Sequence, residues 1–146
     1  MTEILLFRGA RIDGGAAADI LVADGRIAAV GAALSRAGAQ VIDADGLIAL
    51  PGLVDLHTHL REPGYEASET VLTGSRAAAG GGYTAVFAMP NTSPVADTAG
   101  VVEQELALGE AAGLVTVQPI GAVTVGQRGE RLAELGAMAS SRARVR

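Results

Sequence analysis

Two histidines, the only ones in the chain, lie two residues apart at His57 and His59. They stand in a run of β-forming residues, and side chains two positions apart on a strand point to the same face of a sheet. Two imidazoles side by side are typical ligands of zinc. Solvent-facing histidines would give the same short pattern, but the expected strand and the flanking Asp55 and Arg61 favour a metal site.

Strand alternation also predicts which neighbours share the face of the histidine pair. Asp55 and Arg61 should lie on that face, while Val54, Leu56 and Leu60 should pack on the opposite, apolar one. An inward Arg61 could bind an anion, because a guanidinium pairs with a carboxylate through two parallel hydrogen bonds. A simple surface charge is the alternative interpretation of this arginine.

A second polar candidate is Asn91, which follows an apolar run ending at Met89-Pro90. We expect it to open a loop at the same edge of the sheet as His59. Its side chain could bond the amide or the carboxylate of a substrate there. A turn-forming role between Pro90 and Pro94 explains the same residue equally well.

Alternating strand and helix signals must position these residues in the second part of the chain. Buried strands are predicted at 53–60, 83–89 and 114–123. Helices are predicted at 68–79, from a cap at Asp97 or Thr98 to 112, and at 130–138. This order implies parallel strands with right-handed crossovers, in a βα barrel or a doubly wound sheet.

The first part of the chain has a different character. Runs of β-formers cover 4–12, 19–30 and 40–50, and Asp-Gly pairs at Asp24 and Asp45 interrupt two of them. Because Asp-Gly is a strong hairpin signal, we expect a small antiparallel sheet. We place the domain boundary at Pro51, which gives domains 1–50 and 51–146.

Composition excludes several classes of protein. The chain has 146 residues, 49% of them hydrophobic, a formal charge of −5 and no cysteine. All eleven basic residues are scattered arginines, so we expect no nucleic-acid partner. With no long apolar run and no positively charged signal segment, we expect a cytoplasmic protein that does not bind membranes.

Three stretches together resemble one known family. The run Pro51–Gly64 looks like the opening motif of the dihydroorotases, in the amidohydrolase superfamily, and the stretches 81–95 and 123–130 are similar to the segments that follow. The first strands resemble the small β-sandwich of this family. The resemblance spans residues 1–139 and about the first third of a family member. The absence of lysine fits the bacterial type whose two metals are bridged by an aspartate, or a type whose bridging lysine lies beyond residue 146.

The resemblance implies an α/β fold: the N-terminal part of a (β/α)8 amidohydrolase barrel, incomplete in this chain, preceded by strands of a small β-sandwich. It implies two zinc ions, with His57 and His59 as metal ligands. Arg61 and Asn91 would hold the carboxylate of the small-molecule substrate, with His59 beside it. The implied reaction is the reversible closure of N-carbamoyl-L-aspartate to dihydroorotate in pyrimidine biosynthesis.

The same resemblance implies ligands that the chain lacks. The bridging carboxylate, two further histidines and the general-base aspartate would lie beyond residue 146, so no catalytic residue is assigned and we expect the chain alone to be inactive. The segment 140–146 has three arginines among its last five residues and no core pattern. A frame change near codon 139 or a truncated gene model would explain this atypical end.

Two alternative functions remain open from the sequence. Hydantoinases and allantoinases share the paired histidines, although Arg61 and Asn91 favour a substrate with a carboxylate. A non-catalytic dihydroorotase-like partner of aspartate carbamoyltransferase is a further possibility, which the retained histidine pair disfavours. A homo-oligomer is also compatible with the sequence.

Overall fold

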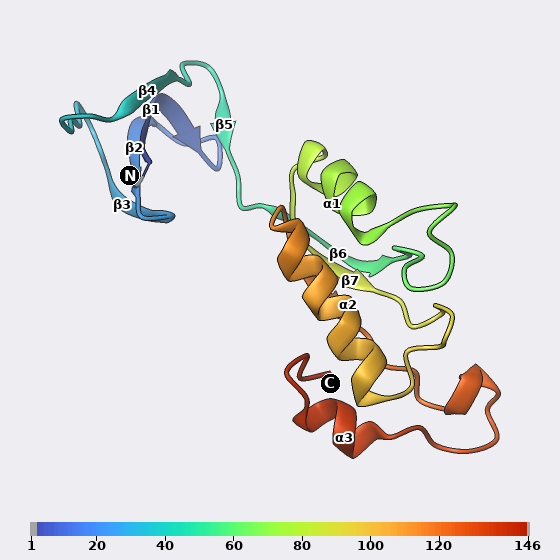
Figure 1. The fold of residues 1–146 in the computed structure, drawn as a ribbon. Helices are drawn as coiled ribbons and strands as arrows, with labels where there is room; N and C mark the ends of the chain where they lie inside the picture. Colours follow the sequence, from blue (N-terminus) through green and yellow to red (C-terminus); the bar gives the residue numbers. More distant parts are fainter. Residues whose placement is uncertain (1–2, 146) are drawn as a thin grey trace. The chain divides into compact units, whose positions relative to one another are not determined.

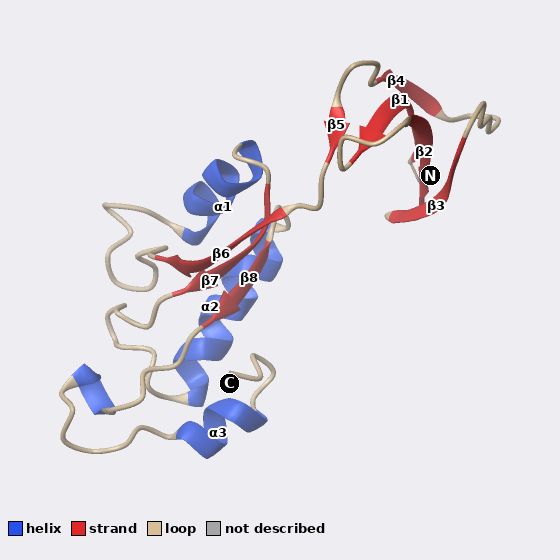
Figure 2. Ribbon diagram, turned by 180° about the vertical axis from the view of Figure 1, so that it is seen from behind, coloured by secondary structure: helices blue, strands red, loops and turns tan. Residues whose placement is uncertain are grey.

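A computed structural model describes residues 3–145 and divides the chain into two compact units, residues 1–51 and 52–146. The N-terminal unit is a sheet of five strands, and the C-terminal unit combines three strands with helices (Figures 1 and 2). No helix among residues 3–145 is long and apolar enough to cross a membrane.

The N-terminal sheet has the strand order β3-β2-β1-β4, and β5 also pairs with β1. Its strands are β1 (Ile4–Ile12), β2 (Ala17–Ala23), β3 (Arg26–Gly31), β4 (Gln40–Asp43) and β5 (Ile48–Ala49). The hairpin predicted at Asp24-Gly25 is present between β2 and β3. Asp24 and Gly25 have φ angles of 53° and 69°, as a two-residue turn with two left-handed positions requires.

The sheet is not purely antiparallel, and the hairpin expected at Asp45-Gly46 is absent from it. Both β4 and β5 pair with β1 in parallel, along successive parts of the same strand. The reason is an interruption of β1 at Gly9, where φ is 78°. A side chain there would begin 3.4 Å from the Asp45 Cα atom, so the β4–β5 connection packs against this gap.

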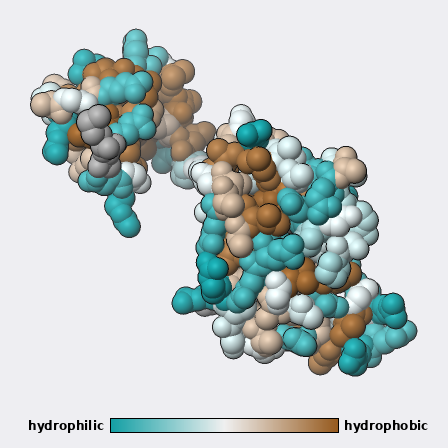
Figure 3. All heavy atoms as spheres, in the orientation of Figure 1, coloured by the Kyte–Doolittle hydropathy of each residue, from teal (hydrophilic) through white to brown (hydrophobic). Residues whose placement is uncertain are grey.

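Large apolar side chains remain exposed on the N-terminal unit, as the hydrophobic surface in Figure 3 shows. Ile27 and Leu50 are each 68% exposed, and Leu47 is 60% exposed. Leu6, Ala10 and Leu21 are buried. Within the described residues, this sheet therefore covers only part of its own apolar surface.

The C-terminal unit follows the predicted alternation of strands and helices. Its main elements are β6 (Leu53–Thr58), α1 (Val71–Gly80), β7 (Tyr83–Ala88), α2 (Ala99–Ala112) and β8 (Thr116–Pro119). The three strands are parallel in the order β6-β7-β8. Both helices lie on one side of this sheet: α2 is in front of the strands in Figure 1 and behind them in Figure 2.

The core of this unit lies between the sheet and its two helices. It is formed by buried aliphatic residues from strands, loop and helix: Leu60, Val71, Val86, Ala88, Val115 and Val117. The helix α2 approaches β8 so closely that a Cβ atom on Gly109 would lie 2.5 Å from the Val117 Cβ atom. Glycine is therefore required at the helix–strand contact, and it helps to fix the position of α2.

The predicted helices differ from the structure mainly at their ends. Thr70 and Thr73 form a capping box, so α1 begins at residue 71. Gly113, in the left-handed region at φ 62°, ends α2 as expected. The helix predicted at 130–138 is only α3 (Leu135–Ser140), preceded by the short turn η1 (Val125–Gln127).

The reason for the shorter third helix is a backbone pairing that precedes it. The N–H of Val125 donates to the carbonyl of Arg131, and the N–H of Ala133 donates to the carbonyl of Val123. Thr124 and Leu132 form the bridge between them. The backbone groups of 131–133 are thus used in a small antiparallel pairing and are not available to a helix.

The segment after residue 139 is packed, although its sequence shows no core pattern. Ala143 is 2% exposed in a cluster with Met138 and Val102. Its carbonyl accepts a hydrogen bond of 2.7 Å from the Gln118 side chain, and the Arg142 guanidinium donates to both Glu110 carboxylate oxygens at 2.9 Å. The last arginine, residue 146, lies outside the described residues.

Candidate functional site

The polar residues singled out from the sequence lie at the carboxyl ends of neighbouring parallel strands. His57 is the last residue but one of β6, His59 follows the end of this strand, and Asn91 lies in the loop after β7. In α/β folds with parallel strands, functional residues gather at this edge of the sheet. The structure therefore places the candidate residues where such folds bind and convert their substrates.

The two histidines lie side by side, as their spacing predicts. Their ring centroids are 5.2 Å apart with an angle of 67° between the ring planes. The Nδ1 atom of His59 lies 2.8 Å from the Oδ1 atom of Asn91. Because an amide oxygen only accepts hydrogen bonds, His59 donates from Nδ1 in this contact.

Leu60 is buried with Val71 of α1 as predicted, but the other residues around the pair do not follow the predicted alternation. Asp55 and Thr58 line the side of the sheet that faces α1, whereas Val54 and Leu56 are 52% and 66% exposed. The cause is an irregularity of β6 between Asp55 and Thr58, where its register with β7 shifts. The prediction that Asp55 shares the face of the histidines, with Val54 and Leu56 packed beneath the helices, is therefore wrong.

Asp55 has a local structural contact in place of the expected site contact. Its Oδ1 atom accepts a hydrogen bond of 3.0 Å from the backbone N–H of His57. This bond holds the pKa of the Asp55 carboxyl below its usual range. The carboxylate thereby supports the irregular backbone that presents His57.

Arg61 lies beyond the end of β6, so strand alternation does not set the direction of its side chain. It occupies the left-handed region at φ 64°, which is uncommon for a residue with a side chain. Its carbonyl accepts a hydrogen bond of 2.9 Å from the N–H of Tyr65, which closes the turn. Arg61 is partly buried, and the hydrogen bonds of residues 3–145 include none from its guanidinium.

The turn that holds Arg61 packs directly on the loop that holds Asn91. The N–H of Ser93 donates to the carbonyl of Pro63 at 2.9 Å. Gly64, at φ 101°, lies so near Ser93 that an added Cβ atom would be 2.5 Å from the Ser93 Cβ atom. The two loops are therefore joined by a hydrogen bond and a close contact, and a shift of one requires a shift of the other.

The paired imidazoles have the chemistry of zinc ligands, but they do not complete a site. A histidine that binds a metal normally donates its other ring N–H to an oxygen, as His59 does to Asn91. Among residues 3–145, no group of three or more histidine, aspartate or glutamate side chains is close enough together to hold a metal ion. The residues present fit two positions in the ligand set of such a site.

Behind the Asn91 loop lies a buried carboxyl group that sequence analysis did not find. Glu105 of α2 is 1% exposed, and its Oε1 atom lies 3.3 Å from the hydroxyl of Thr92. Burial raises the pKa of Glu105 to about 8. Its spacing from Val102 and Gly109, both buried on the same helix face, was the available signal that this residue points inward.

This buried carboxyl makes the stability of the chain depend on pH. The unfolded chain releases the Glu105 proton near the ordinary pKa of 4.5, whereas the folded chain keeps it up to about 8. Between these values the unfolded state binds fewer protons, so the free energy of unfolding falls by up to about 1.4 kcal/mol per pH unit. Urea unfolding at pH 5, 6, 7 and 8 measures this slope.

The matched control for this prediction is Glu105→Gln, which keeps the size and hydrogen-bonding capacity of the side chain but does not titrate. We expect the decline in unfolding free energy from pH 5 to pH 8 to be smaller in this variant than in the wild type. Equal slopes in the two proteins would contradict a protonated, buried Glu105.

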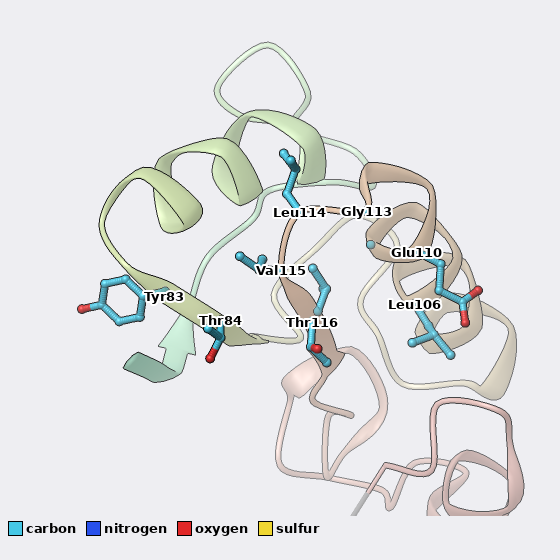
Figure 4. A pocket seen from close by; sticks show the side chains of 10 residues that line it. Tyr83, Thr84, Leu106, Glu110, Gly113, Leu114, Val115 and Thr116 are labelled. Atoms are coloured by element: carbon cyan, nitrogen blue, oxygen red, sulfur yellow. The ribbon is translucent and has the colours of Figure 1, made fainter. Parts of the chain in front are cut away.

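One large pocket of the C-terminal unit lies away from this site. Its volume is about 520 Å³, and Tyr83, Thr84, Val115 and Thr116 line it at the amino ends of β7 and β8 (Figure 4). The histidine pair and Asn91 lie at the opposite ends of the strands. Because this hollow holds none of the candidate residues, we assign it no part in the chemistry.

Two solved structures with a similar fold are hydantoinases. The chain is similar to an L-hydantoinase (dihydropyrimidinase) from Arthrobacter aurescens, with 28% identity and a TM-score of 0.74 over 94% of this chain and 30% of that one. It is also similar to a D-hydantoinase, with 27% identity and a TM-score of 0.59 over 86% of this chain and 27% of that one. The class indicated by the fold is the amidohydrolases.

Within that class, the chain belongs to the dihydro-orotase-like family, whose sequence model matches residues 46–145. It is 74% identical over 144 residues to a dihydroorotase of Leifsonia xyli subsp. xyli and 65% identical over 140 residues to one of Streptomyces coelicolor. These matches cover 99% and 96% of the chain but 33% of each relative. The chain thus spans about a third of the length of the curated relatives it matches.

The comparisons also extend the family resemblance beyond its expected end at residue 139. The family model reaches residue 145, and the match with the Leifsonia protein leaves out at most two residues of the chain. The packed segment after residue 139 is therefore family sequence, and a frame change near codon 139 is not needed to explain it.

Proposed function

We propose that the chain supplies the first metal- and substrate-binding residues of a dihydroorotase, an enzyme that reversibly closes N-carbamoyl-L-aspartate to dihydroorotate. The observation that supports this most is the arrangement of His57, His59 and Asn91 at one edge of a parallel sheet, in a chain 74% identical to a dihydroorotase. Family membership makes the chain part of a hydrolase, and the substrate is our inference from the site.

The fold has a corresponding interpretation. We propose that β6, β7 and β8 are the first three strands of a (β/α)8 barrel, and that the sheet of residues 1–50 is a portion of a small β-sandwich. The exposed Val54 and Leu56 would face the inside of that barrel, which barrel strands fill with branched aliphatic side chains. This explains why two large apolar residues of β6 point away from α1.

His57 and His59 would hold zinc, and the amidohydrolase family generally uses this metal. When bound, zinc supplies a water of lowered pKa and polarises the amide carbonyl. In this chain the Nδ1 atom of His59 donates to Asn91, so Nε2 would be the atom that holds the metal. The Oδ1 atom of Asn91 is thereby used, which leaves the two N–H donors of its amide for an anionic substrate.

Arg61 would fix the substrate carboxylate together with Asn91. A guanidinium can bind a carboxylate through two parallel bonds, which sets the plane of the anion as well as its position. Orientation of the ring in this way would bring its amide to the histidine pair. The uncommon backbone conformation of Arg61 is consistent with a functional demand at this turn.

The chain by itself should not turn over dihydroorotate. Two imidazoles are half of the four ligands typical of a zinc site, and residues 3–145 hold no third metal-binding side chain near them. A bridging carboxylate, two more histidines and a general-base aspartate must come from other residues of a complete site. Without these residues the chain should bind zinc weakly and leave the attacking water without a fixed position.

Two other functions are weaker candidates. A hydantoinase or allantoinase would use the same histidine pair, and the solved structures of hydantoinases are similar in fold but only 27–28% identical. A non-catalytic partner of aspartate carbamoyltransferase would have no need of the His59–Asn91 contact. A homo-oligomer is compatible with either function.

A chimera with the Leifsonia dihydroorotase tests the proposed substrate. Residues 1–146 replace the matching third of that protein, whose remaining two thirds supply the other ligands. We expect zinc-dependent ring opening of dihydroorotate and little or none of hydantoin or allantoin. Preference for either of the latter two compounds would favour a hydantoinase or an allantoinase.

The role of Arg61 gives a separate prediction in the same chimera. Arg61→Lys keeps the positive charge but cannot form the two parallel bonds, so KM for dihydroorotate should rise about tenfold or more. The value of kcat should change less. An unchanged KM would show that Arg61 does not bind the carboxylate. Steady-state kinetics with dihydroorotate measure both constants.

A further inference from the structure

The buried Glu105 has one polar contact and no evident structural need for a carboxyl group. Its Oε2 atom is buried without a hydrogen-bond partner among the described residues, and its Oε1 atom meets only the Thr92 hydroxyl. A carboxyl group so placed is expected to be neutral, because burial disfavours its charged form. A neutral carboxyl has an O–H group that can donate a hydrogen bond.

The Thr92 hydroxyl takes part in two hydrogen bonds, one as donor and one as acceptor. The Thr92 hydroxyl lies 2.8 Å from the carbonyl of Pro94 and must donate its single proton there, since a carbonyl only accepts. Towards Glu105 the same oxygen therefore accepts. Two hydrogen bonds in series therefore link the Glu105 carboxyl to Thr92, and Thr92 to the Pro94 carbonyl in the same loop.

The loop held in this way is the one that carries Asn91. Thr92 follows Asn91 directly and is 7% exposed. The next residue, Ser93, packs on the Arg61 turn through the bond to Pro63 and the close approach of Gly64. The contact of Glu105 with Thr92 therefore acts on both loops of the candidate site.

We propose that Glu105 is a positioning residue: through Thr92 it sets the backbone of residues 91–94 so that the Asn91 side chain meets His59. This inference rests on the proposed dihydroorotase function for its chemical meaning. Glu105 touches neither metal nor substrate, and its effect is to keep His59 in one tautomer and the Asn91 amide in place. Asn91 then presents its N–H donors in a fixed direction.

The tautomer of His59 is the direct test, measured by 15N NMR of the imidazoles in the full 146-residue chain at pH 7.5. Glu105→Leu keeps an apolar volume in the core but removes the bond to Thr92. We expect His59 to change from a proton held on Nδ1 to a mixture of both tautomers. Glu105→Gln can still donate to Thr92, and its His59 signals should match the wild type.

His57 is the internal reference, because it belongs to β6 and has no hydrogen bond to Asn91 among the described residues; its signals should stay unchanged in every variant. Thr92→Val and Thr92→Ser form a second pair, and only the valine variant should alter His59. This second pair decides the question if Glu105→Leu fails to fold. Unchanged His59 signals in folded Glu105→Leu or Thr92→Val would overturn the proposal.

Kinetics in the chimera separate this proposal from the proposed function. Glu105→Leu should raise KM for dihydroorotate about tenfold, with Glu105→Gln near the wild-type value. If the chimera is inactive on dihydroorotate but His59 responds to Glu105→Leu, the proposed function fails and the positioning role stands. If the chimera is active but neither His59 nor KM responds, the positioning role fails.

Discussion

Replacement of His59 by alanine in the chimera should abolish zinc-dependent ring opening of dihydroorotate. The change removes one of the two imidazole ligands that this chain supplies and also the partner of Asn91, whose Oδ1 atom lies 2.8 Å from His59. Loss of a residue that merely supports a ligand costs about 10–100-fold, so loss of the ligand itself should exceed about 100-fold. Turnover of dihydroorotate and zinc content by elemental analysis are measured on the same sample.

His57→Ala should behave in the same way, because its ring lies 5.2 Å from that of His59 on the same face. Arg76→Ala is the control, since Arg76 is exposed on α1. A His59→Ala chimera that keeps its zinc and its turnover would show that the pair does not bind the metal.

The second large effect is expected for Gly64→Ala. The new Cβ atom would lie 2.5 Å from the Ser93 Cβ atom and closer still to the Ser93 carbonyl oxygen, and Gly64 has a φ of 101°. Backbone cannot yield as a flexible side chain can, so the joined loops must separate. We expect a loss of about 2–4 kcal/mol in stability and a higher KM, because both Arg61 and Asn91 are displaced.

Gly82→Ala separates the effect of the clash from that of backbone conformation. Gly82 lies in the same unit, has a φ of 84° and meets nothing within 4 Å of an added Cβ atom. Its replacement should cost only about 1–2 kcal/mol and leave KM unchanged. Urea unfolding and steady-state kinetics compare the two variants; equal effects would mean that the contact of Gly64 with Ser93 is unimportant.

The sequence predicted the parts of the site that depend on local spacing. The two-residue separation of His57 and His59 placed their rings together, and the apolar runs located β6, β7 and the helices between the strands to within a few residues. Asn91 was expected at the same edge as His59, and its amide lies against the His59 ring. Regular alternation was enough for these features.

The errors come from irregular backbone and from long-range contacts. An irregularity in β6 placed Asp55 on the side of α1, and the break at Gly9 let β4 and β5 pair with β1 in parallel. A single sequence shows neither feature, because a bulge or a pairing partner is chosen by the whole sheet. Glu105 was missed for a related reason: its helix spacing from Val102 and Gly109 indicates an inward position, but its polar partner Thr92 lies thirteen residues away.

Ring opening of dihydroorotate by the chimera, with the 146-residue chain alone measured beside it, tests the central claim most directly. That claim is that His57, His59, Arg61 and Asn91 form the first part of a dihydroorotase site that other residues complete. We expect the chimera to turn over dihydroorotate in a zinc-dependent way and the chain alone to show no turnover. A folded chimera that binds zinc but does not act on dihydroorotate, or turnover by the chain alone, would contradict this account.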